Sequence, residues 1–357
     1  KKNANMNKNH HIKIQNRLVG DNYEPLIIAE IGINHNGNLS IAKKLVDAAY
    51  KAGAEVIKHQ THVVEDEMTE EAKKIIPSHT KDSIYNIIKK CSLSEKDEFK
   101  LMNYVKKKGM IFISTPFSKK AVDRLIKFKV PAFKIGSGEC NNYPLIEYIS
   151  KFKKPVILST GMNSIKSIYP AVKILRKYKI PYALLHCTNI YPTPTKLVRL
   201  DCIKVLKKNF PDAVIGLSDH SRSIYTCLGA IALGARIVEK HFTDTKNRKG
   251  PDISASMDKN EFKFLKKGIK EIFYARGSNK EPIKQESSTI RFAYASVAAT
   301  KDILKGQKLS KKNIFPRRPG IGDFLAKDYK MLIGKTARIN IKNNTLIRKK
   351  NIKWKFL

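Results

Sequence analysis

The sequence predicts a (β/α)8 barrel followed by a small domain rich in β-strands. Eight short apolar runs occupy the first two-thirds of the chain, segments with helical periodicity separate them, and polar or charged residues follow each run. The runs span residues 26–31, 55–58, 110–114, 132–135, 155–158, 182–185, 213–217 and 236–238. In a barrel of this class the carboxyl ends of all strands lie at one rim, where the chemistry gathers.

Polar side chains at the ends of the runs therefore define the candidate site. They are Glu30, Lys58, Gln60, Thr115, Lys134, Ser137, Glu139, Thr160, His186, Asn189, Tyr191, Ser218, His220, Glu239 and His241. We expect these side chains to meet at the same rim, although they are far apart in the sequence.

Local signals predict further elements of the barrel. Residues 12–24 have a strand–turn–strand pattern around Gly20-Asp21-Asn22, which favours a hairpin that closes the bottom of the barrel. Ser40 is a good N-cap for a helix that runs to about Gly53. The connection 63–91 is too long for a simple loop and is a candidate rim insertion or lid.

The periodicity also divides the chain into parts. Residues 1–10 are expected to be disordered, and residues 258–275 to form the last barrel helix. From Ile290 the pattern changes to short strands split by glycines, which indicates a separate β-rich domain. The predicted parts are a tail and hairpin (1–24), the barrel (25–276), a linker (277–289) and the terminal domain (290–357).

Composition favours a globular protein of the cytoplasm. The chain is 42% hydrophobic and 8% aromatic, and no run reaches the eighteen or more apolar residues of a membrane span. The Lys- and Asn-rich start lacks the apolar core of a signal peptide. Five cysteines, without a C-x-x-C pair, fit reduced thiols that fill the core: Cys91, Cys140, Cys187, Cys202 and Cys227.

The net charge of +39 would by itself suggest a nucleic-acid or anionic partner. The excess is mostly lysine spread along the whole chain, and neither zinc-finger spacing nor an aromatic and basic RNA-binding segment accompanies it. Residues 258–357 hold 26 Lys and Arg against 8 Asp and Glu, so this end could still attract anions. We expect neither a nucleic-acid nor a membrane partner.

His220 and His241 follow the last two runs, which are neighbours in a closed barrel. Two imidazoles there could hold a divalent metal and leave positions open for substrate and water. On pattern alone, ordinary hydrogen-bonding histidines explain these positions as well.

Lys58 and Lys134 should project into the same mouth from the second and fourth strands. A buried lysine is costly unless it is paired, so two of them imply a bound phosphate or carboxylate. The polar residues that could complete this cradle are Thr115, Ser137, Asn189 and Ser218. The alternative is that the lysines pair with barrel carboxylates such as Glu30 and Glu139.

Together, the segments at the rim resemble the N-acetylneuraminate (sialic acid) synthase family, in its bacterial form. They are AEIGINHNG (29–37), IKHQTH (57–62), FKIGSGECNNYPLI (133–146), KPVILSTGMNSI (154–165), LLHCTNIYPTP (184–194), IGLSDHS (215–221), EKHFTD (239–244) and GPDI (250–253). The resemblance runs from about residue 12 to the C-terminus. RRPGIGDF (317–324) is similar to the signature of the antifreeze-like (SAF, β-clip) domain of these enzymes.

The resemblance implies a reaction and a cofactor. Such enzymes condense phosphoenolpyruvate with open-chain N-acetylmannosamine in the presence of Mn2+, or Mg2+ or Co2+, and release phosphate by C–O cleavage. Residues that match those gripping phosphoenolpyruvate are Lys58, Thr115, Lys134, Ser137, Asn189 and Ser218. The matching metal ligands are His220 and His241, and the matching sugar-binding residues are Gln60, Glu139, Tyr191 and Asp252.

Arg318 matches an arginine that one subunit inserts into its partner's active site, which implies a domain-swapped homodimer. Among the catalytic groups, Lys58 and Lys134 are expected to stabilise the phosphate. Glu30 is the first hypothesis for the group that handles protons, and Glu239 is the second.

Several alternatives remain at this point. Relatives in the same family make legionaminic or pseudaminic acid, or use the 6-phosphorylated sugar to give a 9-phosphate. Arg222 could favour a phosphorylated sugar, although a solvated surface arginine is the simpler interpretation. Other classes are a metal-dependent aldolase or hydrolase, and an anion- or nucleic-acid-binding protein on a degenerate barrel.

Overall fold

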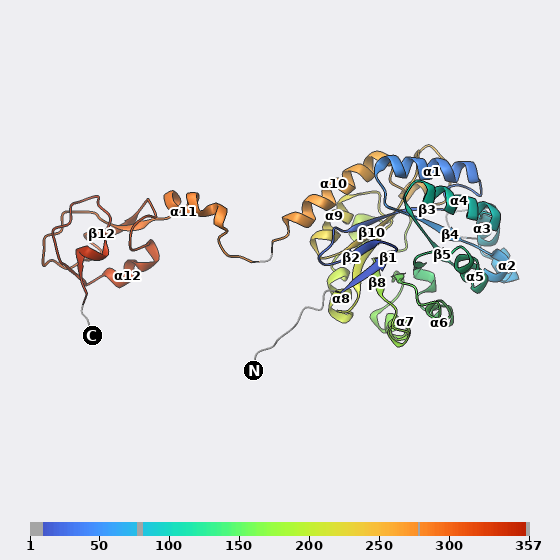
Figure 1. Cartoon of the computed structure of the whole chain (residues 1–357), viewed down its shortest axis with the longest axis horizontal. Helices are drawn as coiled ribbons and strands as arrows, with labels where there is room; N and C mark the ends of the chain where they lie inside the picture. The colour runs from blue at the N-terminus through green and yellow to red at the C-terminus, as the bar shows by residue number, and fades with distance from the viewer. Residues whose placement is uncertain (1–9, 77–80, 278, 355–357) are drawn as a thin grey trace. The chain divides into compact units, whose positions relative to one another are not determined.

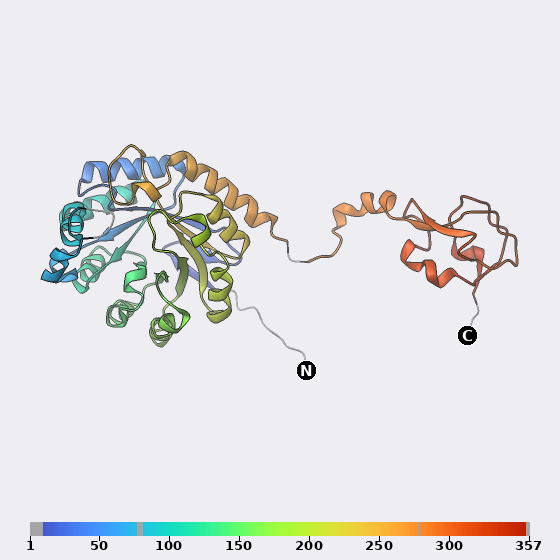
Figure 2. The same ribbon diagram turned by 180° about the vertical axis from the view of Figure 1, so that it is seen from behind.

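The computed structural model describes residues 10–76, 81–277 and 279–354. The chain forms two compact units, Lys1–Gly277 and Ser278–Leu357, which Figures 1 and 2 show from opposite sides. The predicted disordered tail lies almost wholly outside the described residues. Within them, no helix is both long and apolar enough to cross a membrane.

Eight parallel strands close into a barrel in the first unit, which confirms the predicted fold. The strands follow one another around the ring in chain order, and β10 pairs with β3 to close it. They are β3 (Leu26–Gly32), β4 (Val56–Thr61), β5 (Ile111–Pro116), β6 (Phe133–Ile135), β7 (Val156–Ser159), β8 (Tyr182–Cys187), β9 (Val214–Asp219) and β10 (Ile237–His241).

Most strands extend further than the apolar runs predict. β9 continues to Asp219 and β10 to His241, where the runs end at 217 and 238. The reason is that the polar side chains at these ends are buried inside the fold while their backbones keep the parallel hydrogen bonds. Hydrophobicity alone therefore places the strand ends too early.

Helices follow the strands and cover the outside of the barrel (Figure 1). Asn38, not the predicted Ser40, caps the first helix: its side chain accepts a hydrogen bond from the amide of Ile41, and the helix begins at Leu39. The predicted end is confirmed, since Gly53 has a left-handed φ of 86°. The barrel helices are α1 (Leu39–Ala52), α4 (Glu95–Lys107), α5 (Lys119–Lys127), α6 (Tyr143–Ser150), α7 (Ile165–Lys177), α8 (Cys202–Asn209), α9 (Tyr225–Ala232) and α10 (Lys259–Ala275).

The predicted hairpin is present, but its turn is elsewhere. β1 (His11–Ile14) pairs with β2 (Arg17–Gly20), so the chain turns at residues 15–16, where Gln15 has a φ of 57°. Ile12, Ile14 and Val19 are buried in one apolar cluster with side chains from inside the barrel. Burying these three side chains sets the register, and the polar segment 20–22 is left to connect the hairpin to β3.

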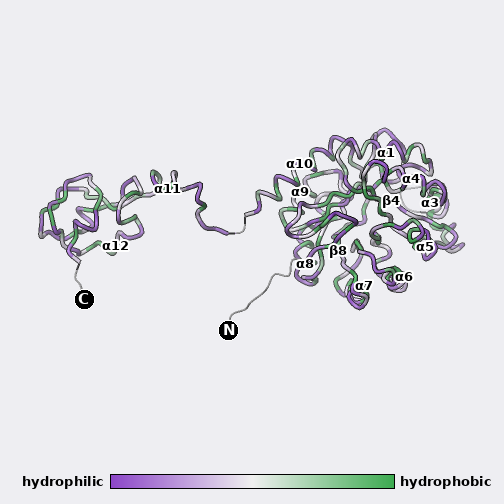
Figure 3. The backbone as a smooth tube through the Cα atoms, in the orientation of Figure 1, coloured by the Kyte–Doolittle hydropathy of each residue, from purple (hydrophilic) through white to green (hydrophobic). Residues whose placement is uncertain are grey.

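A second apolar cluster lies between the strands and the surrounding helices and forms the main core. In Figure 3 the hydrophobic colour follows the strands, and the hydrophilic colour dominates the outer helices and loops. The five cysteines are free, and four of them are buried. The long connection after β4 contains α2 (Val64–Glu67), the 3-10 helix η1 (Glu70–Lys74) and α3 (Ile84–Cys91); residues 77–80 are outside the described residues.

The second unit has a small apolar core of its own. Two antiparallel pairs, β11 with β12 and β13 with β14, frame it, as expected for a β-rich domain. Its elements are α11 (Ser287–Ala293), β11 (Ser296–Ala299), β12 (Ile314–Arg317), α12 (Tyr329–Leu332), β13 (Thr336–Ala337) and β14 (Ile352–Lys353), with the 3-10 helices η5 (Lys284–Glu286), η6 (Ala326–Asp328) and η7 (Lys349–Asn351).

Candidate active site

One pocket at the carboxyl ends of the strands brings together most of the residues that the sequence singled out. The predicted residues that line it are Lys58, Gln60, Thr115, Lys134, Ser137, Asn189, Tyr191, Ser218, His220, Glu239 and His241. Residues from seven of the eight strands, β4 to β10, and from the loops that follow several of them line this pocket, as the barrel geometry requires.

The two lysines occupy the floor of the pocket and are both buried. Lys58 forms an ion pair with Glu30 of the neighbouring strand β3. Lys134 Nζ donates to Ser159 Oγ (2.7 Å) and lies 3.4 Å from Glu239 Oε1. The alternative interpretation of paired lysines is therefore correct for Glu30.

Glu139 does not pair with a lysine. It belongs to the short 3-10 helix η2 (Ser137–Glu139), and its Oε2 accepts a hydrogen bond of 2.6 Å from Asn142. Glu139 is not among the residues that line the pocket, although its neighbours Ser137 and Gly138 are. Burial raises its pKa, although the bond from Asn142 opposes this shift.

The charged groups on the floor of the pocket affect one another's pKa values. Burial is the main cause that lowers the pKa of Lys58 to about 8; the attraction of Glu239 opposes this shift, and the nearby Lys134 charge adds to it. Burial alone would raise the pKa of Glu239, but Lys134 and Lys58 bring it below its usual range. Glu239 is therefore ionised at neutral pH between two cationic neighbours.

The two histidines lie at the side of the pocket, with ring centroids 5.4 Å apart. Burial lowers the pKa of His220 to about 4 and that of His241 to about 3, so both imidazoles are neutral at pH 7. His220 Nδ1 bonds to the carbonyl of Thr188 (3.0 Å), which fixes its ring. His241 Nδ1 is buried and has no hydrogen-bond partner among the residues that the structure describes; it lies 3.6 Å from Asp252 Oδ2.

Neutral imidazoles with an unsatisfied ring nitrogen suit a metal ion. A preformed group of three or more His, Cys, Asp or Glu ligands is absent from the described part of the chain. The two histidines would thus leave several coordination positions for water or substrate, as catalytic sites do.

Tyr191 covers the histidines from the loop after β8. Its ring stacks on His220, with centroids 4.0 Å apart and planes inclined by 27°. The same loop is held down by Thr193, whose amide donates to the carbonyl of His220 (3.0 Å). At 41% exposure, Tyr191 lies at the entrance rather than in the floor.

The sequence model of the NeuB family matches residues 45–281, well over half of the chain, and that of the SAF domain matches residues 294–353. The chain belongs to the NeuB family. This confirms the resemblance to the sialic acid synthases on which the sequence prediction depended.

Relatives of this NeuB-family chain include enzymes of nonulosonic acid synthesis. An N,N'-diacetyllegionaminic acid synthase from Campylobacter jejuni is 39% identical over 331 residues, 90% of this chain and 98% of that protein. An uncharacterized protein from Methanocaldococcus jannaschii is 43% identical over 313 residues, 87% and 90% of the two chains. The crystal structure of an N-acetylneuraminic acid synthetase from Leptospira borgpetersenii has a TM-score of 0.73 and 32% identity, covering 79% of this chain and 95% of that one.

Six predicted residues of this NeuB-family protein do not line the pocket. Thr160 donates to the carbonyl of Leu185 (2.9 Å), and His186 bonds to the carbonyl of Val198 (2.6 Å). Glu30 forms an ion pair with Lys58, which does line the pocket, and Glu139 accepts a hydrogen bond from Asn142. Asp252 lies beside His241, in the loop after β10. Arg318 belongs to the second unit, so its role remains a prediction.

The pocket also contains residues that the sequence reasoning did not select: Phe117, Gly136, Gly138, Ser159 and Cys187. Ser159 holds Lys134, and its neighbour Gly161 donates its amide to Ser137 Oγ (3.0 Å). Both lie within the segment STGM at 159–162, which carried the resemblance and from which the sequence reasoning selected only Thr160. The signal that could have found them is that the strands on both sides of β7 also end in polar residues that the sequence reasoning did select.

Proposed function

We propose that this NeuB-family protein condenses phosphoenolpyruvate with open-chain N-acetylmannosamine and water to give N-acetylneuraminate and phosphate. The observation that carries the proposal is that a lysine pair and a histidine pair open into one pocket. An anion cradle beside a metal-binding pair is what this condensation needs, because one reactant is a phosphate ester and the other an aldehyde.

Phosphoenolpyruvate would bind on the floor of the pocket. Lys58 and Lys134 would contact its phosphate and carboxylate, and the hydroxyl and amide groups that surround them are those of Thr115, Ser137, Asn189 and Ser218. Thr115 Oγ1 supports this assignment, since it is buried without a hydrogen-bond partner among the described residues. A ligand oxygen would satisfy it.

Charge balance supports a divalent cation. The Lys58 and Lys134 ammonium groups face the carboxylates of Glu30 and Glu239, so the four charges cancel before any ligand binds. A phosphate ester that enters this neutral group adds negative charge, which a cation at His220 would offset. We propose Mn2+, or Mg2+ or Co2+, as the cofactor.

His220 and His241 would hold this ion, and the unsatisfied Nδ1 of His241 fits the role. When bound, the ion supplies Lewis-acid polarisation of the sugar aldehyde. Asp252 is close enough to His241 to orient its ring or to join the ligands through water.

The remaining steps follow from the side chains of the pocket. C3 of phosphoenolpyruvate forms the new bond to the sugar aldehyde carbon, whose oxygen takes a proton. Water then adds to C2 and loses one proton. The bond between C2 and the phosphate oxygen breaks, the hydroxyl left on C2 becomes the ketone, and its proton leaves with the phosphate, which the lysines stabilise. We place Glu239 ahead of Glu30 as the proton acceptor, because Glu239 lines the pocket. An anion that neutralises its lysine neighbours would also raise its basicity.

The sugar would lie above this floor, toward Gln60, Glu139, Tyr191 and Asp252. Gln60 and Tyr191 line the pocket and are the better placed of the four. We further propose that Arg318 of a second copy completes the pocket in a domain-swapped homodimer. An inactive Arg318→Ala protein mixed with an inactive His241→Asn protein should then regain part of the activity, since one of the hybrid sites is intact.

A second candidate substrate is the 2,4-diacetamido sugar that leads to diacetyllegionaminic acid. The observation that favours it is the Campylobacter jejuni relative, which is 39% identical along nearly the whole chain. The chemistry at the aldehyde and at phosphoenolpyruvate is the same for both sugars, so the floor of the pocket does not discriminate between them.

The test is direct. The purified protein is incubated with phosphoenolpyruvate, Mn2+ and each sugar in turn, and phosphate release is measured beside the nonulosonic acid product, with and without EDTA. Stoichiometric, EDTA-sensitive release with N-acetylmannosamine supports the proposal. Release with the 2,4-diacetamido sugar or the 6-phosphate alone reassigns the substrate, and no release with any of the three sugars refutes the synthase function.

A further inference from the structure

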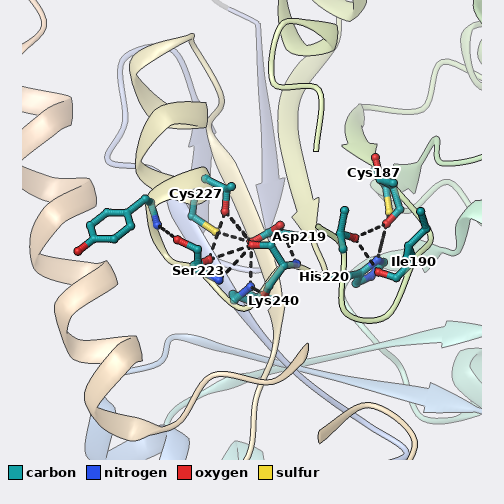
Figure 4. A network of polar contacts seen from close by, with 12 residues as sticks. Cys187, Ile190, Asp219, His220, Ser223, Cys227 and Lys240 are labelled. Atoms are coloured by element: carbon teal, nitrogen blue, oxygen red, sulfur yellow. Dashed lines mark hydrogen bonds and ion pairs between the residues drawn. The ribbon is translucent and has the colours of Figure 1, made fainter. Parts of the chain in front are cut away.

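A buried ion pair lies directly behind the two histidines. Asp219, the last residue of β9, lies opposite Lys240 of β10 in the parallel register. Lys240 Nζ is 2.8 Å from Asp219 Oδ2, and both side chains are 1% exposed. The pair faces helix α9 rather than the pocket, since Asp219 also accepts from Thr226 Oγ1 (2.9 Å) and Cys227 Sγ (3.4 Å) of that helix (Figure 4).

This ion pair bonds to the backbone on both sides of His220. Asp219 precedes the histidine, and Ser221 follows it. Ser221 donates to the Asp219 carboxylate from its amide (3.1 Å) and its Oγ (2.8 Å). The Lys240 ammonium donates to the Ser221 carbonyl as well as to Asp219. Because Lys240 is also the residue before His241, one ammonium group connects the chain at His220 to the strand end at His241.

The burial of two charged side chains at this position has a free-energy cost. Taking them out of water costs free energy that their attraction repays only with good geometry and additional hydrogen bonds, and apolar side chains of similar volume avoid that cost. Apolar side chains, however, could not bond to the amide and carbonyl of Ser221. The bonds around Asp219 thus fix a backbone turn, and that turn carries His220 (Figure 4).

We propose that Asp219 and Lys240 are positioning residues that hold His220 and His241 in the relative placement required to bind one divalent cation. The inference rests on the proposed function, in which these histidines are the metal ligands. The ion pair acts from the opposite side of the strand ends and does not line the pocket. It sets the separation of the two rings, whose centroids are 5.4 Å apart.

The test measures Mn2+ binding by the full chain without substrates, from the electron paramagnetic resonance signal of free Mn2+. The variants are Asp219→Asn, Lys240→Met and the two combined; Asn keeps the shape of Asp and can still accept hydrogen bonds from Ser221. Each single variant should raise the Mn2+ Kd by about tenfold or more, as losses of supporting contacts around metal ligands do.

Glu98→Gln is the matched control. Glu98 lies on α4, is 1% exposed, accepts a bond of 3.0 Å from Arg124 and lies 3.1 Å from His59 Nδ1, so neither of these partners is a proposed metal ligand. The Glu98→Gln change, like the Asp219 and Lys240 changes, should lower the melting temperature. It should alter the Mn2+ Kd by no more than about twofold. The comparison separates loss of stability from loss of positioning.

Each outcome either supports or overturns the positioning role of Asp219 and Lys240. Weaker Mn2+ binding in the folded Asp219 and Lys240 variants, but not in the Glu98 variant, supports the positioning role. If a single variant fails to fold, the combined variant, which leaves no unpaired charge, takes its place. Equal Mn2+ affinity in all proteins, or an equal loss in the Glu98→Gln protein, overturns the positioning role. An unmutated chain that neither binds Mn2+ nor makes product refutes the proposed function as well.

Discussion

Lys134 and Glu239 meet across the barrel. Their strands, β6 and β10, are opposite members of the ring of eight, yet Lys134 Nζ lies 3.4 Å from Glu239 Oε1. Lys58 acts on the same carboxylate from β4. An anion that enters the pocket must therefore compete with Glu239 for two ammonium groups, and this competition links substrate binding to the basicity of Glu239.

Removing the charge of Glu239 should separate binding from catalysis. In Glu239→Gln the lysines lose their competitor, so the KM for phosphoenolpyruvate should not rise, whereas kcat should fall by about 100-fold or more because a proton acceptor is lost. Steady-state phosphate release measures both constants. Glu30→Gln is the comparison: if Glu30 supports Lys58 and does not handle the proton, its main effect should be on KM. A larger loss of kcat in Glu30→Gln than in Glu239→Gln would restore Glu30 as the catalytic carboxylate.

The binding of phosphoenolpyruvate should weaken at alkaline pH. Burial lowers the pKa of Lys58 to about 8, so its ammonium form is complete well below pH 8 and is lost as the pH rises through that value. The kcat/KM for phosphoenolpyruvate, which reports the free enzyme, should be level at lower pH and fall above about pH 8. Lys58→Arg, which stays charged, should lower kcat/KM but remove the fall. The same decline in both proteins would rule out Lys58 as its source.

Gly161 leaves room for two of the proposed phosphoenolpyruvate contacts. A Cβ at this position would overlap Asn189 Oδ1 and lie 2.8 Å from Ser137 Oγ. Gly161→Ala should therefore raise the KM for phosphoenolpyruvate by about tenfold or more, since misplaced binding groups are costly. Gly138→Ala is the comparison, because nothing lies within 4 Å of its Cβ position. Equal effects of the two changes would mean that Asn189 and Ser137 do not bind this substrate.

Asn34 connects the first strand of the barrel to the loop after the last one. Its Nδ2 donates to the carbonyl of Phe242 (3.0 Å) and to Ser256 Oγ (2.9 Å), and Ser256 in turn bonds to the carbonyl of Asp252 (2.8 Å). Asn34→Ala should cost about 2 kcal/mol of unfolding free energy, because buried polar groups lose their partner. It should also raise the KM for the sugar more than that for phosphoenolpyruvate. Urea denaturation and initial rates test the two parts, and an unchanged sugar KM would argue against a role of Asp252 in sugar binding.

The sequence predicts the barrel well because each strand is buried on both faces, which leaves a continuous apolar run. It predicts the pocket because polar residues at the ends of these buried strands are directed to the rim, where the strand ends meet. It predicts strand ends and turns less well. The hairpin turns at Gln15, which has no turn-forming signal of its own, because the burial of Ile12 and Val19 decides the register.

Residues that face away from the pocket were the hardest to assign. Asp219 and Lys240 stand next to the histidines in the sequence and were not selected; strand alternation directs them to the side opposite the pocket, where they pair with each other. Glu139 follows the end of β6, but a turn of 3-10 helix redirects it to Asn142. The position of Glu139 depends on a single backbone turn, for which hydrophobic periodicity carries no signal.

The hairpin at the start of the chain has a kinetic consequence. Ile12, Ile14 and Val19 plug the end of the barrel opposite the pocket, so the reactants share one entrance. With the lysines at the floor and Tyr191 at the mouth, the anion that binds deepest has to arrive first, and the sugar then closes the way out. An enzyme whose active site has a single entrance should follow a compulsory order of substrate addition. The sugar analogue that fills the mouth should then trap phosphoenolpyruvate and not compete with it.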